Sequence, residues 1–196
     1  MPKTYTINIK RLRILYHNAC GYKKTFFEIL KHIDEFSTDE LFMSTAVVNG
    51  MFAIELFIKF LYANKHIKQD FAEFFEGHQL WDLYKSLDRK TKGKIRSRIN
   101  SKIYYFMKRI IKDNKSGRGI YGNVVEWRYL NDNVKKYKIN FDYMVKIIYV
   151  LYDMSNAICR KIENNDIKLP TFSSPVLSQE SLNIINDKIY FDDDIY

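Results

Sequence analysis

Proton transfer near neutral pH is the chemistry that the four histidines of this chain could perform, because imidazole changes charge between about pH 5 and 8. The histidines are His17, His32, His66 and His78. His78 stands in GHQLWDLYKSL, residues 77–87, where a short amphipathic helical pattern begins. It could be a helix-start residue, a core residue or part of a site that handles phosphate. His32 and His66 fall at predicted helix edges without partner spacing, which favours a solvated role over metal ligation.

A charged pair interrupts the most apolar stretch of the chain, where Glu55 and Lys59 lie four residues apart. With glutamate first, this spacing is the favourable order for an ion pair on one helix. Because the neighbouring residues are apolar, at least one of the two side chains is expected to face inward. The same charges break the apolar run 51–62, so we do not expect this run to cross a membrane.

The sequence lacks the usual motifs for metal, disulfide and nucleotide-phosphate sites. Its two cysteines, Cys20 and Cys159, are far apart and form no C-x-x-C pair, so neither a zinc site nor a disulfide scaffold is expected. GRGIYG, residues 117–122, lacks the Lys-Ser/Thr of a P-loop and is interpreted as a flexible connection. Residues 1–20 have no signal-peptide layout. We therefore expect no metal, no cofactor and a cytoplasmic location.

Positive charge is concentrated in one segment of this chain, whose net charge is +9. Residues 85–118 hold thirteen Lys and Arg against two Asp, and Tyr104, Tyr105 and Phe106 lie among them. Such a segment suits a nucleic-acid backbone, with aromatic side chains available to stack bases. A solvated helix face and a membrane-surface helix are the alternatives. The residues predicted to bind RNA are Lys92, Lys94, Arg96, Arg98, Lys102 and Arg109.

Helical periodicity dominates the chain, and strand-type alternation is scarce. Each expected helix has one apolar stripe, which is the pattern of an all-α antiparallel helical bundle over residues 1–164. Residues 165–196 carry six acidic and two basic residues and are predicted to form a linker followed by an acidic tail. The tail could be a short hairpin, a docking motif or a frayed end. The expected helices span residues 8–36, about 40–63, 78–87, about 90–112 and about 140–163. The first could be one helix or two, with Gly21 a candidate interruption, and the second follows an N-cap cluster at residues 37–39.

Three stretches of the chain carry a family resemblance. They are ELFIK at residues 55–59, GHQLWDLY at 77–84 and the Arg128–Tyr129 pair in EWRYLND, ahead of the last long helix. In this order they resemble the Glu-Leu-x-x-Lys, Gly-His-x-Leu-x-x-Leu-Tyr and Arg-Tyr motifs of the HEPN family of small helical-bundle proteins, over roughly residues 40–163. The resemblance implies an RNA-associated homodimer, with an antitoxin or defence-system protein as a further partner.

The resemblance leaves two classes of function open. Many HEPN proteins are metal-independent ribonucleases of toxin–antitoxin, abortive-infection and other antiviral systems. Others are non-catalytic and bind RNA or nucleotides, or act in assembly. The nuclease members carry Arg, four to six residues, then His, typically on the last core helix, and two such motifs meet across the dimer. The histidine can move a proton of the RNA 2′-hydroxyl, and the arginine can hold the developing phosphate charge.

The chain departs from the nuclease pattern on its last long helix. Arg160 lies there, but no histidine follows it. The one match in the chain pairs Arg11 with His17, five residues between, in the first helix. This pair is the second candidate for catalysis.

Five residues of the resembling motifs make up the first candidate set: Glu55, Lys59, His78, Arg128 and Tyr129. In the catalytic interpretation, His78 and Arg128 line a cleft as base and phosphate clamp, and the other three support them. In the structural interpretation, Arg128 forms a buried ion pair with Glu55, and His78 begins a helix. Buried charges in folded domains usually have partners, which favours the structural interpretation.

Overall fold

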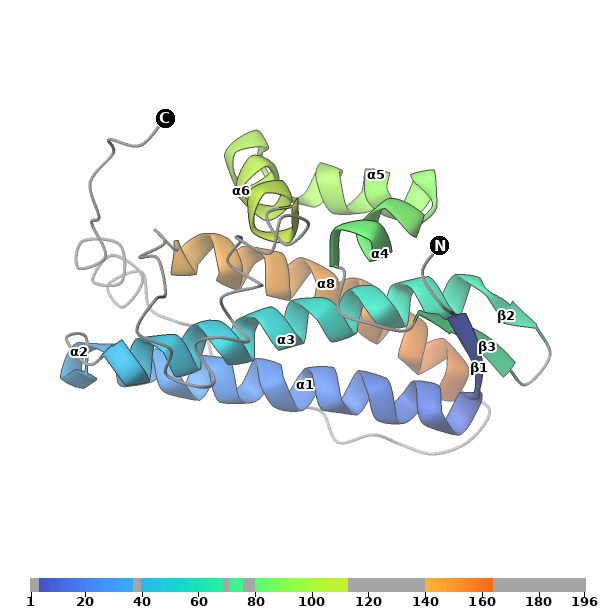
Figure 1. Cartoon of the computed structure of the whole chain (residues 1–196), viewed down its shortest axis with the longest axis horizontal. Coiled ribbons are helices and arrows are strands. Elements are labelled where there is room, and N and C mark those ends of the chain that lie inside the picture. The colour runs from blue at the N-terminus through green and yellow to red at the C-terminus, as the bar shows by residue number, and fades with distance from the viewer. Residues whose placement is uncertain (1–3, 37–39, 69–70, 76–79, 113–139, 164–196) are drawn as a thin grey trace.

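The computed structural model describes residues 4–36, 40–68, 71–75, 80–112 and 140–163. Within these ranges the chain forms the helical bundle that its periodicity predicts (Figure 1). The long helices are α1 (Ile9–Lys31), α3 (Glu40–Lys65) and α8 (Phe141–Glu163). The shorter helices are α2 (Ile33–Phe36), α4 (Leu80–Ser86), α5 (Arg89–Arg98) and α6 (Ser101–Lys112). The predicted N-cap cluster and the acidic tail lie outside the described residues.

Helix α3 is the centre of the fold. It packs along α1 and also contacts α8 and α4, while α5 and α6 contact α8. Figure 1 shows α4, α5 and α6 as a layer on the side of α3 away from α1. By length and composition, Phe42–Lys65 is the one described helix that could cross a membrane, and 78% of its apolar window is buried here. This burial is what a core helix requires. The largest fully buried rings come from all three long helices: Phe26, Phe27, Phe57, Phe60 and Phe141.

A three-stranded antiparallel sheet at one end of the bundle was not expected from the sequence. Its strands are β1 (Thr4–Asn8), β2 (Ile67–Lys68) and β3 (Phe71–Phe75), in the order β1-β3-β2. Thr4 pairs with Phe75 and Asn8 with Phe71. Because β1 runs directly into α1, and β2 follows closely on α3, the sheet ties the ends of these two helices together (Figure 1). The strand β1, TYTIN, does alternate polar and apolar residues, and sequence reasoning missed this signal. The strand β3, FAEFF, does not alternate regularly, and β2 has only two residues.

Helix α1 runs through Gly21 without a break, so this glycine is not the interruption that the sequence suggested. The break comes at His32, whose backbone N–H closes the helix on the Ile29 and Leu30 carbonyls. Helix α1 starts where Asn8, the last residue of β1, accepts a hydrogen bond from the Arg11 backbone N–H at 2.9 Å. An asparagine side chain in this position satisfies one of the free donors at a helix start.

At Gly50, α3 packs closely against both α1 and α8. A Cβ there would lie 2.6 Å from Met144 Cε of α8 and 3.0 Å from the Phe26 ring of α1.

We expect Gly50→Val to lower the free energy of unfolding by about 1–3 kcal/mol, because the core would be overpacked. Gly21→Ala is the matched control: no atom lies within 4 Å of its Cβ position. It should add about 0.5–1 kcal/mol through helix propensity. Denaturant unfolding measures both changes, and equal effects would contradict the packing argument.

The basic segment forms two helices, where the sequence predicted one over about residues 90–112. Ile99 has an extended backbone (φ −125°, ψ 148°) that ends α5. The Asn100 side chain then accepts the Ile103 backbone N–H at 2.8 Å and begins α6. Asparagine in an N-cap position was the sequence signal for this break. The helical spacing did identify the buried side chains correctly: Ile95, Ile103, Phe106 and Ile110 are buried, and Ile99 packs against the core.

Candidate nucleic-acid interface

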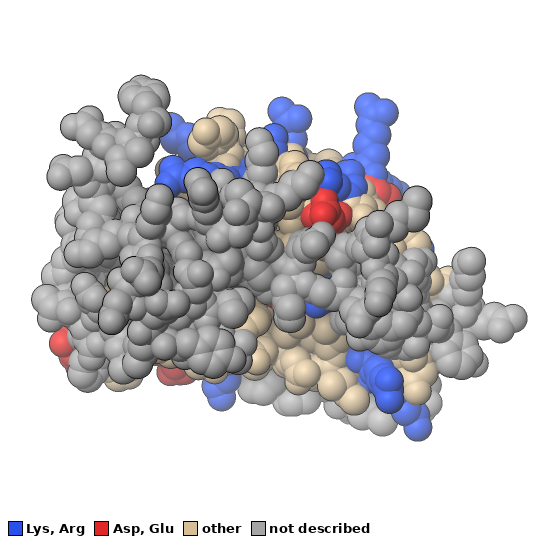
Figure 2. All heavy atoms as spheres, in the orientation of Figure 1, with Lys and Arg blue, Asp and Glu red and all other residues tan. Residues whose placement is uncertain are grey.

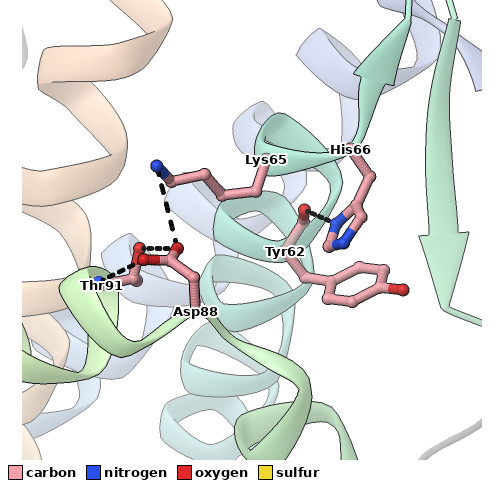
Figure 3. Close-up of polar contacts among 5 residues, drawn as sticks. All are labelled: Tyr62, Lys65, His66, Asp88 and Thr91. Atoms are coloured by element: carbon pink, nitrogen blue, oxygen red, sulfur yellow. Dashed lines mark hydrogen bonds and ion pairs between the residues drawn. The ribbon is translucent and has the colours of Figure 1, made fainter.

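The start of α5 is held by a cluster of polar contacts shown in Figure 3. Asp88 accepts hydrogen bonds from the Thr91 backbone N–H at 2.9 Å and from Thr91 Oγ1 at 2.6 Å. The Lys65 ammonium, at the end of α3, lies 3.8 Å from the same carboxylate. Beside it, His66 Nδ1 hydrogen-bonds the Tyr62 carbonyl oxygen at 2.8 Å. The Asp88 cap therefore sets the start of α5, and the Lys65–Asp88 ion pair lies between this start and the end of α3.

These contacts predict how stability depends on pH. Burial alone would raise the pKa of the Asp88 carboxyl, but the Thr91 hydrogen bonds and the Lys65 charge hold it below its ordinary value. Because the pKa of this carboxyl is lower in the folded state, it stabilises the protein at pH values above its pKa in the unfolded chain. This stabilisation is lost as the pH falls through the pKa of the folded state.

We expect Asp88→Ala to lower the free energy of unfolding at pH 7 by about 0.5–2 kcal/mol. Asp88→Asn should keep most of the cap but make stability less sensitive to acid. Unfolding curves from pH 7 to pH 3 measure this, and an unchanged slope in Asp88→Asn would contradict it.

Helices α5 and α6 carry the densest positive charge of the described chain. Helix α5 has six Lys and Arg and α6 has four, and neither contains Asp or Glu. Figure 2 shows Lys and Arg side chains projecting along the edge of the molecule over these helices. We call the exposed ones the basic surface. Its members are Arg89, Lys90, Lys94, Arg96, Arg98, Lys102, Lys108 and Arg109.

The aromatic side chains of this segment have three different environments. Phe106 is buried in the core, so it cannot stack a base. Tyr104 is partly buried, and its hydroxyl lies 3.1 Å from that of Tyr84 on α4. Burial and the hydrogen bond to Tyr104 raise the pKa of Tyr84 above its ordinary value. Tyr105 is 72% exposed. The predicted role in base stacking can therefore fall to Tyr105, while Tyr104 joins α4 to α6.

Several predicted RNA-binding side chains already have partners within the protein. The Arg96 guanidinium lies 5.5 Å from the centre of the Tyr104 ring. Arg98 forms an exposed ion pair with Asp153 of α8. Lys92 is partly buried, and its ammonium donates to the Lys85 carbonyl oxygen at 2.9 Å. Lys94, Lys102 and Arg109 are exposed, and within the described ranges they have no ion pair. These last three are the most available to a phosphate backbone.

The Glu55–Lys59 pair lies within the core. Lys59 Nζ is 2.7 Å from Glu55 Oε1, and the two side chains are 8% and 1% exposed. Both therefore face inward, where the sequence required only one to do so. His78, Arg128 and Tyr129 lie outside the described residues, so their proposed cleft and the Arg128–Glu55 pair remain predictions.

Arg11 and His17 are both exposed on α1. Six residues of an α-helix turn through about 600°, so the two side chains leave the helix about 120° apart. The His17 ring meets the neighbouring Tyr16 ring edge-on at 5.6 Å. The helix itself does not bring Arg11 and His17 together, and a shared site would need a second surface.

A polar cluster between α1 and α8 was missed by sequence reasoning. Lys23 is buried, with its ammonium 3.6 Å from the centre of the Tyr152 ring, and Tyr16 Oη donates to Asn156 Oδ1 at 3.0 Å. Burial lowers the pKa of Lys23 and raises that of the Cys20 thiol. A thiol kept protonated in this way is a poor nucleophile, so the cluster joins two helices and offers no reactive cysteine. The signal was available: Tyr16, Cys20 and Lys23 share the buried stripe of α1.

The fold and its surface define a helical-bundle protein with a basic helical face. Within the described ranges, no group of three or more His, Cys, Asp or Glu side chains could hold a metal ion. No family model, no curated protein and no solved structure matches this chain.

Proposed function

We propose that this protein binds RNA through the basic surface. The observation that carries the proposal is the run of ten Lys and Arg on α5 and α6 without one acidic residue, most of them exposed. Cations that neutralise phosphates release counterions, so binding of this kind weakens steeply as salt rises. Fluorescence anisotropy with a labelled RNA from low to high salt tests it. An affinity that stays flat across that range would contradict the proposal.

We further propose a HEPN-like, metal-independent ribonuclease of the toxin or antiviral-defence type. The resemblance of the Glu55–Lys59, Gly77–Tyr84 and Arg128–Tyr129 motifs supports this, as does a basic surface suited to RNA. A homodimer and an antitoxin or defence-system partner belong to the same proposal. A non-catalytic RNA- or nucleotide-binding module is the alternative. It is favoured by Arg160, which is exposed on α8 with no histidine after it in the chain.

A ribonuclease assay with EDTA separates the two functions. For the enzyme we expect cleavage despite EDTA and products that end in 2′,3′-cyclic or 3′ phosphate. His78→Ala and Arg128→Ala should each slow cleavage about 100- to 10,000-fold, the range for a lost proton-transfer group or phosphate clamp. Each variant is first checked for helical content. Loss in His17→Ala alone would place the site on α1, and intact RNA with the wild type would leave the binding module.

A further inference from the structure

Tyr105 is the most exposed large hydrophobic side chain of the described residues, at 72%. It lies on the outer face of α6, opposite the buried Ile103, Met107 and Ile110. No hydrogen bond, ion pair or ring contact within the described part of the chain holds it, in contrast to Tyr104 beside it. Its ring is therefore free to receive a flat partner.

Three cations surround this ring on the same helix face. Lys102 lies three residues before Tyr105, and Lys108 and Arg109 lie three and four residues after it, all exposed. Residues at this spacing have Cβ atoms about 5–6 Å apart on a helix. One turn of helix thus places a positive charge on each side of the aromatic ring along the axis of α6.

This arrangement suits a nucleic acid better than a membrane or an apolar protein surface. A membrane-binding helix presents several apolar side chains together. The other exposed large hydrophobic residues of the described chain are Ile14 and Tyr22, both on α1. Figure 1 shows α1 on the far side of α3 from α6, so they cannot extend the patch around Tyr105. A single ring flanked by cations matches a base-stacking platform beside phosphate contacts.

We propose that Tyr105 is a stacking site for an unpaired nucleotide base, with Lys102 and Arg109 holding the phosphates on either side of it. The inference rests on the proposed RNA binding and narrows it to single-stranded segments. In a duplex both faces of each internal base are already stacked on neighbours, so the ring of Tyr105 has no base to receive. The cations of the site can contact the phosphates of either form.

The test compares Tyr105→Ala with the wild type on two probes, an unstructured oligouridylate and an RNA duplex of equal length. Stacking on one aromatic ring predicts about a 5- to 150-fold loss of affinity for the single strand. Duplex affinity should change less than about twofold, and the salt dependence should stay the same because no charge is removed. Tyr105→Phe should bind like the wild type. Tyr22→Ala, which removes an exposed tyrosine from α1, is the matched control.

The outcomes distinguish this site from the proposed function. If the wild type binds both probes with the expected salt dependence but Tyr105→Ala changes neither affinity, RNA binding stands and the stacking site is wrong. Equal losses on both probes, or a Tyr105→Phe variant as weak as Tyr105→Ala, would also overturn stacking. If the wild type binds neither probe at any salt concentration, the proposed function and this site fail together.

Discussion

Replacing Lys94, Lys102 and Arg109 together with glutamine is expected to make RNA binding both weaker and much less sensitive to salt. For a single strand, each neutralised phosphate contributes about 0.7 to the slope of log affinity against log salt. Removing three such contacts should flatten the slope by about 2. Between about 50 and 200 mM salt, the wild type should then lose about 20-fold more affinity than the variant does. Anisotropy titrations at four salt concentrations measure both slopes.

These three residues are chosen because of their surroundings. All are exposed, and none pairs with an acidic side chain within the described ranges. Arg98, by contrast, is occupied by Asp153, and Lys92 by the Lys85 carbonyl. An ion pair that must break before a phosphate binds contributes less to affinity.

A matched triple substitution controls for net charge. Lys10, Lys146 and Lys161 are exposed on α1 and α8 and are not members of the basic surface. Their replacement by glutamine changes the total charge of the protein equally but should leave the salt slope near that of the wild type. If both triple variants flatten the slope to the same extent, binding depends on overall charge and the basic surface is not a defined interface.

The long helices could be predicted from sequence because each carries an apolar stripe long enough to read. The break between α5 and α6 could not, since Ile99 and Ile103 continue the stripe across it and only Asn100 signals a new start. The small sheet was missed although Thr4–Asn8 alternates polar and apolar residues, because this short signal runs directly into a helical pattern. Its pairing with β3 is a contact distant in sequence.

The charge of the candidate interface could be predicted from the sequence, but the exposure of its individual side chains could not. Residue types alone identified the basic segment. Which aromatic ring can stack on a base depends on the helix face it occupies and on the residues packed against it. Phe106 is buried in the core, Tyr104 contacts Tyr84, and Tyr105 is exposed. Similarly, the order of Glu55 and Lys59 predicted their pairing, but only the packing of α3 against its neighbouring helices shows that both are buried.

Lys59→Met is expected to be among the most destabilising single substitutions in this protein. It would leave the Glu55 carboxylate, 1% exposed, without the ammonium that now lies 2.7 Å away. Removing one partner of a buried ion pair costs about 3–5 kcal/mol, because the remaining charge loses a counterion while it stays out of water. Urea unfolding followed by circular dichroism measures the loss.

The Glu28–Lys31 pair on α1 is the matched control. Lys31 Nζ lies 2.9 Å from Glu28 Oε1, but the Glu28 and Lys31 side chains are 48% and 41% exposed. Lys31→Met should cost far less stability, because water already solvates both charges of this pair.

The double variant Glu55→Leu with Lys59→Met decides what the pair contributes. If its role is to satisfy two buried charges, replacing both should recover most of the lost stability, as for other buried pairs exchanged for apolar residues. RNA affinity of the folded double variant should then equal that of the wild type, since α5 and α6 are untouched. A stable double variant that no longer binds or cleaves RNA would instead place Glu55 and Lys59 in the functional site, as the catalytic interpretation of the HEPN-like motifs holds. A double variant as unstable as Lys59→Met would show that the core depends on the Glu55 carboxylate itself.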